Sequence, residues 1–202
     1  MPLTPEEFYE NATSRHSDNR VESNLASWET FPFETEGLKV RALRKPMVPE
    51  APRNGEDPAT CRTCAATNGL PVWANERWQL VAIDEPSGGP LVLVLGPRTH
   101  CDYGDLSEDM AAEFGRVLVA LVRIVESFEH IARAHVLRWG DGSAHMHVFI
   151  SARPEGFSQL RGTFLALWDD VLPPIPRSVR DADAARVGEE LTQLLGGSSR
   201  AR

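Results

Sequence analysis

The chain has few cysteines, no excess of positive charge and no long apolar run, and each shortage narrows the class of protein. Its net charge is −8 over 202 residues. A broad basic surface for nucleic-acid phosphates is therefore not expected, because such binding depends on many Lys and Arg side chains. Only three cysteines are present. This odd number argues against a disulfide framework and favours metal or redox use.

Nothing in the sequence suggests a membrane or an export signal. The longest apolar runs, such as residues 90–95 and 117–125, are too short or too interrupted to cross a bilayer. The polar N-terminus has no basic-then-apolar signal peptide. Hydrophobic residues make up 42% of the chain and charged residues 25%, which is ordinary for a globular protein. We expect a cytoplasmic protein that binds neither membranes nor nucleic-acid polymers.

The composition divides the chain into three parts. Residues 1–60 form an N-terminal extension that ends in a proline-rich connector, with an edge strand predicted at 38–43. Residues 61–180 are long enough for one domain with a core. In residues 181–202 we expect a short helix over 181–195, followed by a disordered tail.

Hydrophobic spacing predicts an α+β domain. A long amphipathic helix is expected over 110–134, with Ser107 as its N-cap. Alternating and short apolar runs predict strands on either side of it, and a second helix follows the last of them. The expected architecture is an antiparallel sheet of about five strands with the long helix packed on it. The strands are predicted at 78–83, 91–95, 135–139 and 145–152, and the second helix at 156–171.

Two pairs of residues carry the strongest chemical signal. Cys61 and Cys64 form a C-x-x-C pair, the usual first half of a zinc site, and His100 and His145 can supply the second half. With all four positions filled by protein, the zinc would be structural. Two alternatives are unliganded loop thiols and a redox pair, and the redox pair fits poorly because Cys61 follows a proline-rich loop. The third cysteine, Cys101, is expected to be a buried small apolar residue.

The spacing of His145 and His147 is the second signal. In a strand, residues i and i+2 project from the same face, so the two imidazoles should lie side by side with Phe149 in line after them. The structural alternative for His147 is a histidine hydrogen-bonded within a half-buried strand. Two histidines beside a metal site favour a chemical role.

From Cys61 to Pro154 the order of these motifs resembles the histidine triad (HIT) superfamily, in its zinc-bearing branch. That branch includes galactose-1-phosphate uridylyltransferase and diadenosine polyphosphate hydrolases. The resemblance implies that His145 is a zinc ligand and His147 the nucleophile, which forms a covalent nucleotidyl-histidine. It also implies that Asp84, after the first core strand, contacts the ribose, and that the protein is a homodimer. For Asp84 the alternative is a turn residue.

Three positions near the histidines concern the substrate. Phe149 stands where the resemblance implies a hydrogen-bond donor to phosphate, and loss of one such donor typically costs about 10²–10³ in rate. Asp141 falls where glutamine is common, and Ser143 could still donate to phosphate. Both also fit a plain hairpin turn. Arg153 directly follows the histidine strand and is the preferred candidate for anion binding.

We therefore expect a zinc-containing hydrolase or nucleotidyltransferase that acts on nucleotide-type phosphoesters or phosphoanhydrides. Its partner would be a small nucleotide-like molecule. Two other functions remain open: a catalytically silent HIT module that binds a nucleotide or a partner, and an HIT scaffold used for a non-nucleotide reaction.

Overall fold

The computed structural model describes residues 4–13, 28–33, 44–66 and 71–199. It divides the chain into two compact units, residues 1–52 and 53–202. The described part of the first unit contains a helix, α1 (Pro5–Thr13), that the sequence analysis did not foresee. The strand predicted at 38–43 lies outside the described residues. The end of the predicted connector, residues 53–60, belongs to the second unit together with the core.

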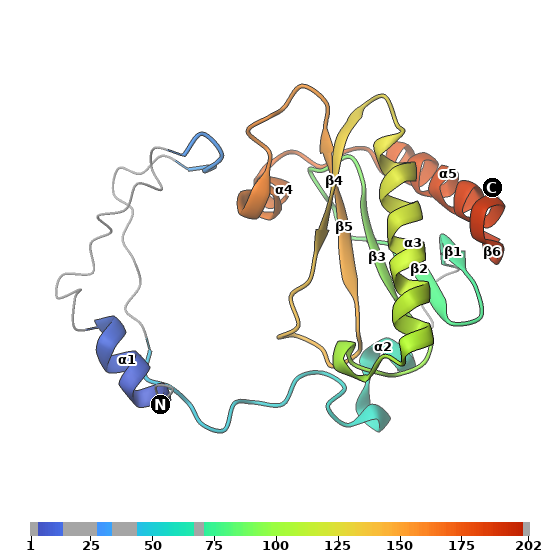
Figure 1. Cartoon of the computed structure of the whole chain (residues 1–202). Helices are drawn as coiled ribbons and strands as arrows, with labels where there is room; N and C mark the ends of the chain where they lie inside the picture. The colour runs from blue at the N-terminus through green and yellow to red at the C-terminus, as the bar shows by residue number, and fades with distance from the viewer. Residues whose placement is uncertain (1–3, 14–27, 34–43, 67–70, 200–202) are drawn as a thin grey trace. The chain divides into compact units, whose positions relative to one another are not determined.

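The second unit contains a six-stranded antiparallel sheet with the order β4-β5-β3-β2-β1-β6 (Figure 1). This confirms the predicted α+β class. The sheet has one strand more than the expected five. Two of its members are only two residues long, too short for a pattern of apolar spacing to reveal. The strands are β1 (Trp73–Ala74), β2 (Trp78–Ala82), β3 (Val92–Pro97), β4 (Ile131–Leu137), β5 (Val148–Pro154) and β6 (Ser198–Ser199).

The main helices lie on both sides of this sheet. Figure 1 shows α3 (Glu108–Glu126) and α5 (Arg177–Leu195) on one side and α4 (Leu165–Val171) on the other. The short helix α2 (Arg62–Ala65) lies beside the loop that precedes α3. The core forms between the sheet and the pair α3 and α5. Its fully buried members include Trp73, Trp78, Leu80, Leu93, Leu95, Leu121, Ile150, Val187 and Leu191.

The long helix begins where the sequence predicts. The Ser107 hydroxyl accepts a hydrogen bond from the backbone N–H of Met110 at 3.3 Å, and acidic residues fill the first turn. The helix ends at Glu126, not at 134 as predicted. The Ser127 hydroxyl donates to the Ile124 carbonyl at 2.7 Å, and the chain enters β4 at Ile131. The apolar residues after the helix continue its spacing but belong to a strand.

The second predicted helix, over 156–171, is wrong in its first half. Gly156 and Gly162 adopt φ of +83° and +64°, which an α-helix cannot contain. A 3₁₀ turn at Gly162–Phe164 leads into α4, which occupies the last seven residues.

The C-terminal segment is part of the core. Helix α5 packs on β1 so closely that a Cβ at Gly188 would stand 2.2 Å from the Val72 carbonyl oxygen. The indole N–H of Trp73 donates to the carbonyl of Gly196 at 2.9 Å. The tail, predicted to be disordered, instead pairs Ser198–Ser199 with β1 as β6. Backbone pairing and helix packing thus extend the ordered unit to residue 199.

Alternation along β4 and β5 defines the face of the sheet that turns away from α3 and α5. Ala134, Ile150 and Ala152 face the core. The residues between them therefore point to the opposite side, which we call the α4 face. On β5 this face carries Phe149, Ser151 and Arg153, and on β4 it carries Arg133, His135 and Leu137. None of the helices in the described part of the chain is long and apolar enough to cross a membrane.

Candidate functional site

Four predicted metal ligands converge at one end of the sheet. The ligand atoms of Cys61, Cys64, His100 and His145 all lie within 4.8 Å of one another. The Nδ1 atom of His145 is 3.6 Å from the Cys61 sulfur and 3.4 Å from that of Cys64, and His100 Nδ1 is 3.5 Å from the Cys64 sulfur. A tetrahedral zinc with ordinary Zn–S and Zn–N bonds separates its ligands by about 3.4–3.8 Å. The donor set and its spacing therefore fit zinc.

A backbone carbonyl orients His145 for this role. The ring is 3% exposed, and its Nε2 lies 2.9 Å from the Pro97 carbonyl oxygen. Because a carbonyl can only accept, Nε2 carries the proton and Nδ1 presents its lone pair to the two sulfurs. Such an outer hydrogen bond is the usual device that orients a metal-binding imidazole.

The two thiols differ in acidity. Burial alone would raise the pKa of Cys61, but the Cys64 backbone and the His145, Cys64 and His100 side chains around the sulfur lower this pKa to about 6. The pKa of Cys64 is raised by desolvation and by the neighbouring Cys61. Cys61 is thus a ready thiolate ligand, and Cys64 gains most from a metal dication, which favours its deprotonated form.

Two residues that the sequence analysis missed tie the connector to this site. Gly55 has φ of +82°, and a Cβ there would come within 3.1 Å of the Cys61 sulfur and the His100 ring. The Asn54 carbonyl accepts from the Ala144 backbone at 2.9 Å, just before His145. The available signal was the Asn-Gly pair itself, a strong turn signal inside the proline-rich connector.

The two histidines do not lie in a strand, contrary to the predicted strand over 145–152. Strand β5 begins at Val148. Immediately before β5, the Met146 N–H donates to the Cys101 carbonyl at 2.8 Å. This hydrogen bond pairs the histidine segment with the loop that carries His100. A Cβ at Gly96 would meet the Met146 carbonyl at 2.9 Å, which shows how closely this segment passes β3. Cys101, predicted to be buried, is half-buried, and burial raises its pKa.

His147 is held by the backbone of the metal ligand. Its Nδ1 lies 2.9 Å from the His145 carbonyl oxygen, so Nδ1 carries the proton and Nε2 keeps its lone pair. The ring is half-buried and packs edge-on against Phe149, with centroids 5.5 Å apart. On the other side of Phe149 lies Trp139, 5.7 Å between centroids and half exposed. An imidazole with a fixed tautomer thus stands beside the Phe149 ring, which in turn contacts Trp139.

The other predicted substrate residues do not all gather at His147. Asp84 forms an ion pair with Arg177 of α5, and its side chain is 76% exposed. It follows Ile83, which bonds to Val92 at the level of Ser151, about 13 Å along the strands from His147. Arg153 lies at the same far end of β5.

The loop before the histidines has a structural role. Ser143 donates to the Asn54 carbonyl at 3.2 Å and accepts from the Asn54 amide and from the His145 backbone N–H. The hydroxyl predicted to contact phosphate therefore joins the connector to the metal ligand in this structure. Asp141 is exposed in the same loop.

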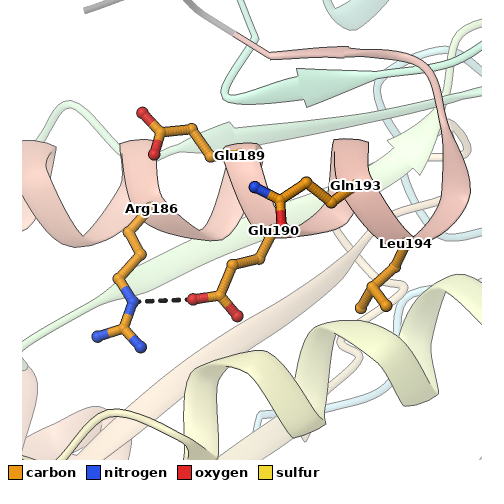
Figure 2. A pocket seen from close by; sticks show the side chains of 5 residues that line it. All are labelled: Arg186, Glu189, Glu190, Gln193 and Leu194. Carbon is orange, nitrogen blue, oxygen red and sulfur yellow. Dashed lines mark hydrogen bonds and ion pairs between the residues drawn. The ribbon is translucent and has the colours of Figure 1, made fainter.

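A separate hollow lies along α5. Figure 2 shows it lined by Arg186, Glu189, Glu190, Gln193 and Leu194. The Arg186 guanidinium pairs with Glu190 at 2.8 Å and covers the Phe128 ring. None of the predicted site residues lines this hollow.

No family model and no curated protein matches the chain. The similar proteins found are solved structures. A hypothetical histidine triad nucleotide-binding protein from Sulfolobus tokodaii is 18% identical, with a TM-score of 0.49, and 70% of this chain covers 100% of that one. A zinc-bound histidine triad family protein from Mycobacterium smegmatis is 17% identical, with a TM-score of 0.48 and coverages of 67% and 96%. A histidine triad protein from Marinobacter aquaeolei is 16% identical, with a TM-score of 0.48 and coverages of 62% and 90%.

Proposed function

We propose that this protein is a zinc-containing hydrolase or nucleotidyltransferase that cleaves nucleotide-type phosphoesters or phosphoanhydrides through a covalent His147 intermediate. The observation that carries the proposal is the hydrogen bond from His147 Nδ1 to the His145 carbonyl. It fixes the tautomer in which Nε2 keeps the lone pair that a nucleophilic attack needs.

The chemistry proceeds in two displacements. The Nε2 lone pair of His147 attacks phosphorus, a P–N bond forms, and the P–O bond to the leaving group breaks. The leaving oxygen takes up a proton. Water or another acceptor then attacks the same phosphorus and gives up a proton to solvent, the P–N bond breaks, and its electron pair returns to Nε2 as the product leaves. The aromatic pair of Phe149 and Trp139 offers a stacking surface for a flat base or leaving group next to this atom.

Zinc has a structural part in this scheme. Cys61, Cys64, His100 and His145 would hold it with no position left for water. Bound there, zinc supplies a fixed anchor for His145, and the His145 carbonyl in turn holds His147. This chain's own imidazole carries out the displacement.

The test is nucleoside monophosphate release from dinucleoside polyphosphates, nucleotide sugars and nucleoside phosphoramidates. Wild type should release the monophosphate from at least one of these substrates. His147→Ala should lower the rate by at least about 10³, as expected on loss of a covalent nucleophile. His130→Ala is the matched control, because His130 is an exposed imidazole paired with Asp183 and should leave the rate unchanged. Equal rates in wild type and His147→Ala would contradict the proposal.

A second candidate function is nucleotide binding without turnover, and Phe149 favours it because this ring cannot donate to phosphate. In that case wild type would release no monophosphate, yet it would bind a nucleoside monophosphate as tightly as His147→Ala does. Isothermal titration calorimetry on both proteins separates the two candidates. Cytoplasmic location and the absence of a polymeric nucleic-acid partner stay predictions from the sequence.

A further inference from the structure

Two arginines face each other at the end of the sheet remote from His147. Arg133 of β4 and Arg153 of β5 are direct partners in the antiparallel register. Like charges placed opposite each other across a strand pair are destabilising. Neither arginine pairs with a carboxylate in the described part of the chain, although the protein carries an excess of acidic residues. Their recorded hydrogen bonds go to nearby backbone carbonyls, those of Ala132 and Pro154.

A histidine with an unused polar atom lies next to this arginine pair. His135 is two residues from Arg133 on the same face and stands opposite Ser151. Its Nε2 atom is buried and has no hydrogen-bond partner. Burial and Arg153 lower the pKa of His135, while Glu126 at the end of α3 acts in the other direction. Buried polar atoms without partners are uncommon in native proteins and call for an explanation.

These three side chains share the α4 face with Phe149, the ring that packs against the proposed nucleophile His147. From His147 to Arg153 the chain advances six residues, about 20 Å in extended conformation. Phe149 and Ser151 lie between them on the same face. A ligand along β5 could therefore contact both ends of the strand.

We propose that Arg133, His135 and Arg153 form an oxoanion site, which binds a phosphate group of a small phosphorylated molecule. Forked guanidinium donors match the oxygens of a phosphate, and a bound dianion would offset the repulsion between the two arginines. The unpaired His135 nitrogen supplies a further polar contact. If His147 is the nucleophile, which rests on the proposed function, this site would hold the end of the substrate remote from the reacting bond.

The test is titration of the folded protein with inorganic phosphate, followed by NMR of the His135 ring and of the Arg133 and Ser151 amides. Sodium chloride keeps the ionic strength constant. Saturable shifts of these signals are expected. The double variant Arg133→Gln/Arg153→Gln should bind phosphate at least tenfold more weakly, and it should stay folded because the substitutions remove a repulsion.

The matched control is Arg186→Gln, which removes an arginine that already has a carboxylate partner on α5 and should bind phosphate like wild type. His147→Ala should also retain the shifts, because phosphate binding at this end does not require the nucleophile. The proposal is overturned if phosphate causes no saturable shift, if chloride alone reproduces it, or if the double variant binds as tightly as wild type. Since the readout is binding, such a failure is distinct from a failure of the proposed activity.

Discussion

At the scale of single residues, two histidines separated by one residue orient their rings differently although they share one short segment. His145 turns its Nδ1 toward the thiols, whereas His147 turns its Nδ1 toward the His145 carbonyl. In each case a carbonyl oxygen determines which nitrogen is left free. The metal ligand and the proposed nucleophile are therefore linked by one backbone group.

The thiols provide the first prediction. Cys61→Ser and Cys64→Ser should each reduce the zinc content from about one ion per chain to a small fraction, because a hydroxyl is a poor replacement for a thiolate. The free energy of unfolding should fall by about 4 kcal/mol or more, as is typical when a structural metal is lost. Elemental analysis and urea denaturation measure the two effects. Cys101→Ser is the control and should retain the zinc.

The third position of the histidine segment provides a second prediction. Phe149→His would place a donor 5.5 Å, centroid to centroid, from the His147 ring, where wild type has none. The turnover number for nucleotide substrates should rise by about tenfold or more, since one transition-state donor is typically worth 10²–10³. Steady-state kinetics check this result. Phe149→Leu, which adds no donor, should show no increase, and an equal gain in both variants would argue against donation.

His135 provides a prediction about pH. Burial and Arg153 depress its pKa in the folded protein below the ordinary value of 6.5, with Glu126 opposing them. Below pH about 6.5 the unfolded chain binds this proton more readily, so stability falls as the pH drops through the folded pKa. His135→Gln should lack this part of the loss while matching the pH dependence of wild type above pH 7. Urea midpoints in phosphate-free buffer between pH 5 and 8 measure the difference.

At the scale of elements, the last helix and the first strand are packed together through a glycine. Gly188→Ala would place a Cβ against the Val72 carbonyl oxygen at 2.2 Å, so α5 must shift. We expect a loss of about 1–3 kcal/mol in unfolding free energy, the usual cost of overpacking. Gly115→Ala in α3 is the matched control. It meets nothing within 4 Å and should stabilise the protein by about 0.5–1 kcal/mol.

Sequence periodicity identified the elements that have a single strong pattern. Strands β2 and β3 and the start of α3 follow directly from apolar spacing and a serine cap. The metal ligands were also predictable, because C-x-x-C and histidine are chemically distinctive. Helix boundaries at Ser127 and Gly162 were not, since they depend on one hydroxyl and one positive φ.

Long-range contacts account for the remaining differences. The joining of β6 to β1 depends on partners more than a hundred residues apart, and no local pattern marks two serines as a strand. The ion pair of Asp84 with Arg177 also joins residues far apart in sequence. The same holds for Asn54, which bonds to the loop before His145. Such contacts appear only once the chain has folded.

At the scale of the whole molecule, β4 forms an edge of the sheet that no second strand among the described residues pairs with. Val136 on this strand is 42% exposed, and free edges of this kind invite pairing with a second copy. We expect a homodimer with twice the 22.4 kDa mass of one chain. Light scattering during gel filtration should report that mass, and Val136→Lys should shift it to the monomer. Val179→Lys on α5, with 46% exposure, is the control and should leave the mass unchanged.

The four ligands of the candidate metal site span 84 residues of the chain, from Cys61 to His145. A zinc ion bound there would act as a removable cross-link that closes a very long loop, and we expect the alignment of His147 to depend on that closure. The activity of any preparation should then be proportional to the concentration of metal-loaded molecules rather than to that of total protein. Under the proposed function, cells short of zinc would contain chains that have the full sequence printed above but in which His147 is not aligned for attack.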